Sequence, residues 1–256
     1  MILTQENYFS KKANQEFMSV SQFKSFKACQ HSALAEVKGK YTPEKSVALL
    51  VGSYVDSYFE GSLETFKKQN PEIFKRDGTL KADFAQAEAI IQRISRDKTF
   101  MKHLSGEKQV IMTGIIKGVP IKIKIDSFRP KEIVDLKIMK DFEPMYVAER
   151  GLLPWFDAWG YDLQGAVYQE VVRQNIGKKL PFVIVAATKE KITDLDNIEL
   201  DQNSLDYALE RFEEDVELYD AIKKGIIPPE RCEKCDYCKL TKKLKRPNKS
   251  EDYYFM

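Results

Sequence analysis

The chain has 256 residues, of which 43% are apolar and 31% charged, and its formal net charge is +2. These values are typical of a folded globular protein with a core of ordinary size, and they exclude a disordered or strongly basic chain. The first residues lack the basic and then apolar pattern of a secretory leader, and no apolar run reaches the length of a membrane span. We therefore expect a cytoplasmic protein with no membrane partner.

The first hundred residues are predicted to be helical after a flexible start. Residues 1–18 are polar and are expected to be irregular. A Ser-x-Ser pattern before apolar residues of helical period begins the helical part, residues 19–100. The expected helices are 21–38, which ends at Gly39, then 44–60 and 81–96, with a loop over 61–80.

Strands are expected from about residue 105, where the hydrophobic period changes from 3.6 to 2. Three strands form a meander, and a later continuous apolar run is typical of a strand buried on both faces. The expected strands are 108–116, 119–126, 132–138, 181–187 and 192–200, and the expected helices are 141–150, 160–176 and 201–224. This order predicts a single α/β domain over residues 1–256, with a mixed central β-sheet flanked by helices as its core (105–225).

The second and third strands carry a candidate set of charged side chains. Strand alternation and the turn at Arg129-Pro130 bring Asp126 close to Asp135, with Lys137 on the same side as Asp135. Two adjacent carboxylates repel unless a cation lies between them, and Mg²⁺ or Mn²⁺ prefers such oxygen ligands. The alternative is an ordinary solvated strand face on which these aspartates form ion pairs with lysines.

Three of the four cysteines lie in Cys232-Glu-Lys-Cys235-Asp-Tyr-Cys238, within a C-terminal segment at 228–246, and the fourth is Cys29. In a reducing compartment such a cluster favours metal binding over disulfides. Four thiolates suit either one iron–sulfur cluster or one Zn²⁺ ion. If Cys29 joins the other three, the site closes most of the chain into a loop.

The ordered motifs together resemble the PD-(D/E)XK nuclease superfamily, in its RecB-like and lambda-exonuclease-like (phage-type exonuclease) branch. The resemblance covers residues 19–245 and begins with the Ser-x-hydrophobic opening at Ser21 that precedes Cys29. It continues with Ile125-Asp126, with Ile133-Val134-Asp135-Leu136-Lys137, and with a Gln-x-x-x-Tyr motif at Gln164 and Tyr168. The cysteine set resembles the four-cysteine [4Fe–4S] motif of AddB-type nucleases.

The resemblance implies a restriction-endonuclease-like fold and a metal-dependent DNA exonuclease of recombination, repair or phage DNA processing. The implied metal ligands are Asp126 and Asp135, joined by Asp56, which stands where the family often has His. Lys137 is the implied catalytic cation, while Gln164 and Tyr168 are implied to contact substrate. Cys29, Cys232, Cys235 and Cys238 are implied to hold a [4Fe–4S] cluster, with Zn²⁺ as the alternative. DNA is the implied partner, and a single-strand annealing or recombination protein is a candidate second one.

Two other classes of function compete with the enzyme. The first is a non-catalytic DNA-binding module with a degenerate nuclease site, which the aspartate at position 56 and the near-zero net charge favour. The second is a zinc-stabilised protein with no role on nucleic acid. The sequence has no P-loop, so it does not predict an ATPase or helicase.

Overall fold

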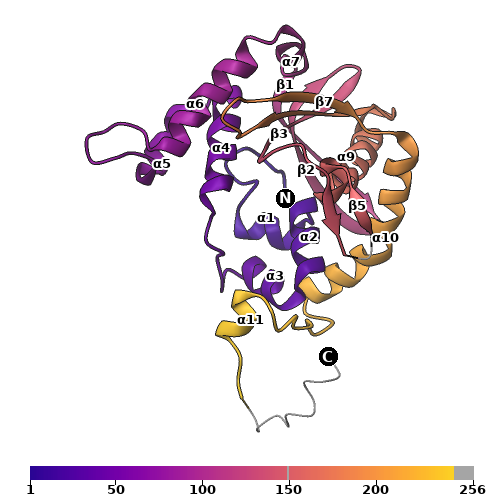
Figure 1. The fold of residues 1–256 in the computed structure, drawn as a ribbon. Coiled ribbons are helices and arrows are strands. Elements are labelled where there is room, and N and C mark those ends of the chain that lie inside the picture. Colours follow the sequence, from indigo (N-terminus) through magenta and orange to yellow (C-terminus); the bar gives the residue numbers. More distant parts are fainter. Residues whose placement is uncertain (149, 245–256) are drawn as a thin grey trace.

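Five strands form one mixed sheet at the centre of the molecule (Figure 1). The computed structural model describes residues 1–148 and 150–244. The strand order is β1-β2-β3-β6-β7, and all neighbours are antiparallel except β3 and β6, which are parallel. The strands are β1 (Glu107–Ile116), β2 (Val119–Arg129), β3 (Glu132–Met139), β6 (Phe182–Thr188) and β7 (Leu195–Glu199). The predicted α/β class, with helices around a mixed sheet, is confirmed.

Helices cover both faces of the sheet, because successive side chains of each strand point to opposite sides. One face packs against α2 (Val20–Ala28), α3 (Gln30–Val37), α9 (Tyr161–Ile176) and α10 (Gln202–Lys223). The other packs against α4 (Val47–Glu60), α6 (Ala82–Ser95) and α7 (Lys98–His103). Strand β6 is buried along its whole length between the two layers, as its apolar sequence predicted.

β2 and β3 pair only near their connecting turn and then separate. Their last pair is Ser127 with Val134, whereas β2 stays paired with β1 back to its first residue. The N-terminal segment forms hydrogen bonds with backbone groups of β2 that β3 does not pair with. The Met18 N–H donates to the carbonyl of Pro120, and the Lys122 N–H donates to the carbonyl of Met18. Backbone groups inside a protein need such partners. A gap therefore opens between two neighbouring strands of the sheet.

The expectation of an irregular segment over residues 1–18 is wrong for its second half. Helix α1 (Lys11–Glu16) begins there, with the Ser10 hydroxyl accepting the Ala13 N–H as an N-cap. Ala13 and Met18 are both fully buried. The segment is ordered by its packing on the sheet, which its polar composition did not indicate.

The expected helix over 21–38 is broken in the structure. Cys29 has an extended backbone, with φ −164° and ψ 107°, and it divides the segment into α2 and α3. The expected loop over 61–80 contains helix α5 (Leu63–Gln69) and the short 3₁₀ helix η1 (Pro71–Ile73).

The expected helix over 141–150 is wrong. Met145–Val147 (β4) and Gly151–Leu153 (β5) pair as an antiparallel hairpin, and a short helix α8 (Trp155–Ala158) follows. Gly151 has φ 81°, a conformation that suits a hairpin and ends a helix. Residue 149 of the expected helix and residues 245–246 of the expected cysteine segment lie outside the described residues. No helix within the described part of the chain is both long and apolar enough to span a bilayer.

Close packing of α9 on the sheet leads to a prediction about Gly165. A Cβ atom at this position would lie 2.9 Å from the side chains of Leu205 and Phe182. Gly165→Ala should therefore destabilise the protein by about 1–3 kcal/mol, measured by thermal or urea unfolding. Gly52→Ala in α4 is the matched control, because nothing lies within 4 Å of its Cβ. That change should stabilise by about 0.5–1 kcal/mol, and equal effects at both sites would contradict the packing argument.

Candidate functional site

Asp126 lies one residue beyond the last β2–β3 pair, at the point where the strands separate. Its Oδ2 accepts the Leu136 N–H of β3 at 2.9 Å, and Gln109 Nε2 lies 3.4 Å from its Oδ1. The carboxylate thus takes the place of a backbone acceptor that β2 no longer offers to β3. This contact fixes the orientation of the carboxylate within the gap.

Asp135 lies on β3 opposite this point and is almost completely buried, with 3% of its surface exposed. Its Oδ2 forms an ion pair with Lys137 Nζ at 2.6 Å, and its Oδ1 accepts a hydrogen bond from Gln164 Nε2 of α9 at 2.7 Å. A buried carboxylate needs partners of this kind. Asp135 is therefore in direct contact with two other predicted residues, Lys137 and Gln164.

Asp56 reaches the same gap from α4. Together with Glu60, one helical turn further on, and with Asp126 it lines a small cavity of about 10 Å³, which has room for about one water molecule. Asp56 Oδ1 is buried and has no hydrogen-bond partner. Such an oxygen is suited to a ligand that the protein itself does not supply.

The charges in the gap act on one another. Burial, and then the negative charge of Asp135, raise the pKa of Asp126 to about 7. Burial, and then the charge of Asp126, raise the pKa of Asp56 well above its usual range. Burial opposes the charge of Lys137, but the carboxylates of Asp135 and Asp126 outweigh it and raise its pKa. Lys137 therefore offsets only part of the repulsion among these carboxylates.

A divalent cation fits this donor set. Mg²⁺ and Mn²⁺ bind carboxylate oxygens and use water or phosphate for their remaining ligands, so two carboxylates are sufficient. The unpartnered oxygen of Asp56 and the raised pKa of Asp126 both indicate excess negative charge at this point. Among the described residues, the cysteines alone bring three or more ligand atoms within 4.8 Å of one another, so the carboxylates are not gathered into a closed cage.

The Gln-x-x-x-Tyr motif lies on the face of α9 that is turned toward the gap. Gln164 contacts Asp135, and the Tyr168 hydroxyl donates to the carbonyl of Lys124 on the free edge of β2 at 3.1 Å. Both side chains therefore support the opened part of the sheet. Their predicted contact with substrate remains a prediction.

Two residues of the site were not found from the sequence. Glu60 lies four residues after Asp56, and this spacing places both on one helix face. The spacing could therefore have indicated Glu60 as a site residue. Gln109 of β1 has φ 54°, which is rare for a residue other than glycine, and Gln5 Nε2 donates to its carbonyl at 2.6 Å. No sequence signal indicates this conformation, because it arises from the kink of β1 opposite Asp126.

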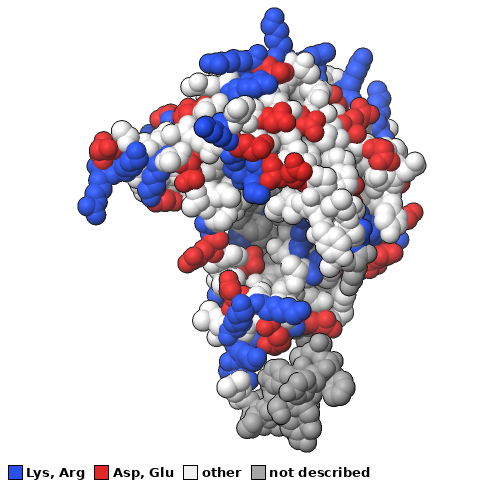
Figure 2. Space-filling model, in the orientation of Figure 1, with Lys and Arg blue, Asp and Glu red and all other residues white. Residues whose placement is uncertain are grey.

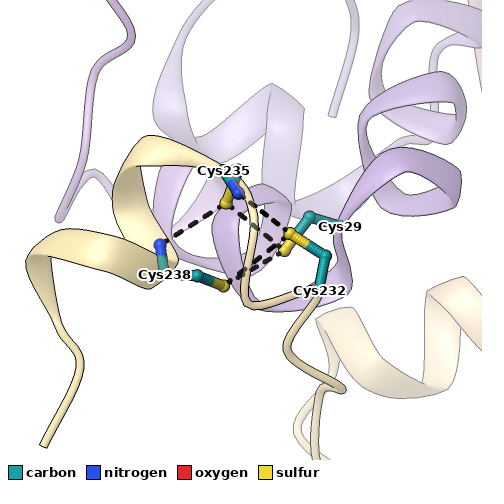
Figure 3. A group of neighbouring side chains, drawn as sticks. All are labelled: Cys29, Cys232, Cys235 and Cys238. Atoms are coloured by element: carbon teal, nitrogen blue, oxygen red, sulfur yellow. Dashed lines mark hydrogen bonds between the residues drawn. The ribbon is translucent and has the colours of Figure 1, made fainter. Parts of the chain in front are cut away.

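The four cysteines meet at the end of the molecule where α11 (Asp236–Leu240) lies beside α3 (Figures 1 and 3). Cys29 comes from the break between α2 and α3, and the other three come from the loop before α11 and from its first turn. The N–H groups of Lys234 and Cys235 donate to Cys232 Sγ, and they lower the pKa of Cys232 to about 6. Such N–H···S bonds stabilise the thiolate form that binds metals.

The spacing of the four sulfurs bears on the kind of metal. Cys29 Sγ lies 3.6 Å from Cys238 Sγ and 3.7 Å from Cys235 Sγ, and Cys232 Sγ lies 4.0 Å from Cys238 Sγ. Sulfurs at the corners of a tetrahedron around one Zn²⁺ are about 3.8 Å apart, given Zn–S bonds of about 2.3 Å. A cubane of four irons holds its thiolates farther apart, because each thiolate binds a different iron. The spacing therefore favours a single tetrahedral ion.

The chain belongs to the family of PDDEXK-like domains: the model of the PDDEXK-like domain of unknown function (DUF3799) matches residues 19–241. A crystal structure of a "putative exonuclease" from Eubacterium rectale is 50% identical, covers 99% of this chain and 98% of that chain, and has a TM-score of 0.96. The structure of SSO0001 covers 79% of this chain and 87% of that chain, with 13% identity and a TM-score of 0.32. No curated protein matches the chain. The predicted superfamily and its restriction-endonuclease-like fold are confirmed.

The raised pKa of Asp126 leads to a prediction for the metal-free protein. Between about pH 4 and 7 the unfolded chain loses this proton while the folded carboxyl keeps it, so stability falls as the pH rises. Asp126→Asn removes this penalty and should stabilise the protein at pH 8 by on the order of 1–2 kcal/mol, and by less at pH 5. Thermal unfolding in EDTA at both pH values measures the difference. Exposed Glu210→Gln is the control, and a gain for Asp126→Asn that does not depend on pH would contradict the assignment.

The cysteine geometry leads to a prediction for Cys235→Ser. Loss of one of four thiolates should release the metal and lower the thermal midpoint, because the ion ties the α2–α3 break to the C-terminal segment. Elemental analysis should find about one zinc per chain in the parent protein and none in the variant. Lys234→Ser, an exposed neighbour, should keep both metal and stability. Iron with visible absorption near about 400 nm in anaerobically purified protein would instead identify a cluster.

Proposed function

We propose that this protein is a metal-dependent DNA nuclease that acts as an exonuclease. The observation that carries the proposal is the meeting of Asp126, Asp135 and Lys137 where β2 and β3 separate, beside the unpartnered carboxylate oxygen of Asp56. Membership of the PDDEXK-like family and the similarity to the Eubacterium rectale protein support a nuclease. The preference for DNA ends rests on the sequence resemblance and on the name of that protein.

In the proposed mechanism the carboxylates of Asp126 and Asp135 hold Mg²⁺ or Mn²⁺, with Asp56 and Glu60 completing the acidic wall. A bound divalent ion supplies a more acidic water and neutralises charge on the phosphate. Lys137 places a positive charge beside the attacked phosphate and orients the attacking water. Gln164 holds Asp135 in place, and with Tyr168 it orients the substrate strand.

For the four cysteines we propose one structural Zn²⁺, bound by Cys29, Cys232, Cys235 and Cys238. The sulfur spacing supports this choice over the [4Fe–4S] cluster that the sequence resemblance implies. The ion would join the C-terminal segment to the nuclease core within a single domain. The proposal extends to the biological process, which would be recombination, repair or phage DNA processing. The protein partner would be a single-strand annealing or recombination protein.

The competing function is a DNA-binding module that does not cut. Two observations favour it: the described carboxylates do not form a compact cage, and Lys137 already occupies one side of Asp135. Binding of linear DNA in EDTA, together with no degradation in Mg²⁺ or Mn²⁺, would identify such a module.

Asp135→Asn tests the catalytic proposal. It removes the charge that pairs with Lys137 and that would hold the metal, so cleavage of end-labelled linear DNA in Mg²⁺ should fall at least about a hundredfold. Glu210→Gln, an exposed carboxylate on α10, should retain parental activity. Circular dichroism and the thermal midpoint establish that both variants fold.

If Asp135→Asn cleaved linear DNA as fast as the parent protein, Asp135 would be excluded from catalysis. A closed circular DNA serves as a second substrate for the parent protein. Degradation of linear but not circular DNA is expected of an exonuclease, and equal degradation of both would reduce the proposal to a nuclease without end preference.

A further inference from the structure

A groove on the molecular surface extends to Gln164, next to the proposed active site. It has a volume of about 230 Å³ and is lined by Phe9, Lys24, Lys122, Lys124, Gln164 and Tyr168, among others. A second hollow of about 260 Å³ continues it and shares Tyr8, Phe9, Ser19, Ser21 and Lys122 with it. Figure 2 shows this side of the molecule hollowed near its centre, with basic atoms inside the hollow. The groove reaches Gln164, whose amide contacts Asp135.

The charge of the groove favours an anionic strand. Lys24, Lys122 and Lys124 line its first part, and no aspartate or glutamate is among the described residues that line this part. Lys24 is held at the groove wall, because its Nζ donates to the carbonyl of Trp159 at 3.0 Å. Lysines along a groove of this kind follow the phosphates of a nucleic acid strand. A passage of this volume is far too small for a double helix.

Phe9 is an exposed aromatic residue on a fixed backbone at the rim of this groove. Its side chain is 70% exposed, whereas the adjacent Tyr8 is only 5% exposed. Buried Lys122 fixes the segment, because its Nζ donates to the Tyr8 carbonyl and to Asn14 Oδ1. The Phe9 and Tyr8 rings form a T-shaped pair, and Lys124 Nζ lies over the Phe9 ring at 5.0 Å from its centroid. The ring thus remains open to a further stacking partner.

We propose that Phe9 stacks on a base of a single DNA strand whose phosphates contact Lys24 and Lys124, so that the groove guides the strand end to Asp126 and Asp135. A single exposed phenylalanine is common on protein surfaces. Here the ring lies beside lysines in a groove that reaches Gln164, a hydrogen-bond partner of Asp135, and this combination matches the platforms that bind single strands. The inference rests on the proposed nuclease function and specifies its substrate as a single-stranded end.

Binding of fluorescein-labelled oligo(dT) of 20 nucleotides, measured by anisotropy in EDTA, tests the proposal without cleavage. Phe9→Ala should weaken binding about tenfold, which is about 1.4 kcal/mol, because it removes the stacking of one base. Phe9→Trp should retain affinity, and its added tryptophan fluorescence should be quenched on binding. Tyr207→Ala removes a similarly exposed aromatic residue, 63% exposed on α10, and should bind like the parent. Blunt duplex of the same length should bind more weakly than the single strand.

The outcomes separate this inference from the nuclease proposal. Parental affinity of Phe9→Ala, an unquenched Phe9→Trp or a preference of the parent for blunt duplex would overturn the stacking role, even if the parent cleaves linear DNA in Mg²⁺. If the parent neither binds nor cleaves DNA, both proposals fail. A parent that binds oligo(dT) through Phe9 but does not cut in Mg²⁺ or Mn²⁺ would support the groove and overturn the nuclease.

Discussion

The early separation of β2 from β3 is the structural constraint on which the site depends. A regular ladder would continue past Asp126 and Asp135 and would fill the space between them with backbone hydrogen bonds. Instead, the pairing ends at Ser127 and Val134, and several of the freed backbone groups have substitute partners. The substitutes are the Asp126 carboxylate, the Tyr168 hydroxyl and the backbone of Met18. The side chains that form hydrogen bonds with the freed backbone groups therefore also line the gap.

Opening the sheet also determines the electrostatics of the gap. Carboxylates that would be solvated at a free edge are instead covered by α4 and α9, so burial and mutual repulsion raise the pKa values of Asp126 and Asp56. Lys137 offsets part of the charge and restrains Asp135. Buried, mutually repelling carboxylates destabilise the metal-free fold and favour the binding of a divalent cation. Active sites commonly lose stability in this way in exchange for function. The site is therefore acidic and only partly neutralised.

The sequence was sufficient for the features that short-range patterns encode. Strand alternation correctly placed Lys137 on the same side of β3 as Asp135, and the motif order identified the superfamily. It failed where tertiary contacts override local preference. Three features each depend on packing against distant segments: the helix break at Cys29, the β4–β5 hairpin and the formation of helix α1. Gln109 is the clearest case at the site, since its positive φ follows from the kink in β1 and from a hydrogen bond to Gln5. The roles of the predicted site residues remain predictions.

The cysteine site and the lysine groove are linked through α2. This helix presents Ser21 and Lys24 to the groove, and it ends at Cys29, which contacts Cys235 and Cys238 through sulfur. Cys29 is the single residue between α2 and α3, so its position fixes the end of α2. A metal at the cysteines would hold this end against the C-terminal segment, and it would restrict the motion of the groove wall. A structural ion can thus contribute to substrate binding without lying near the substrate.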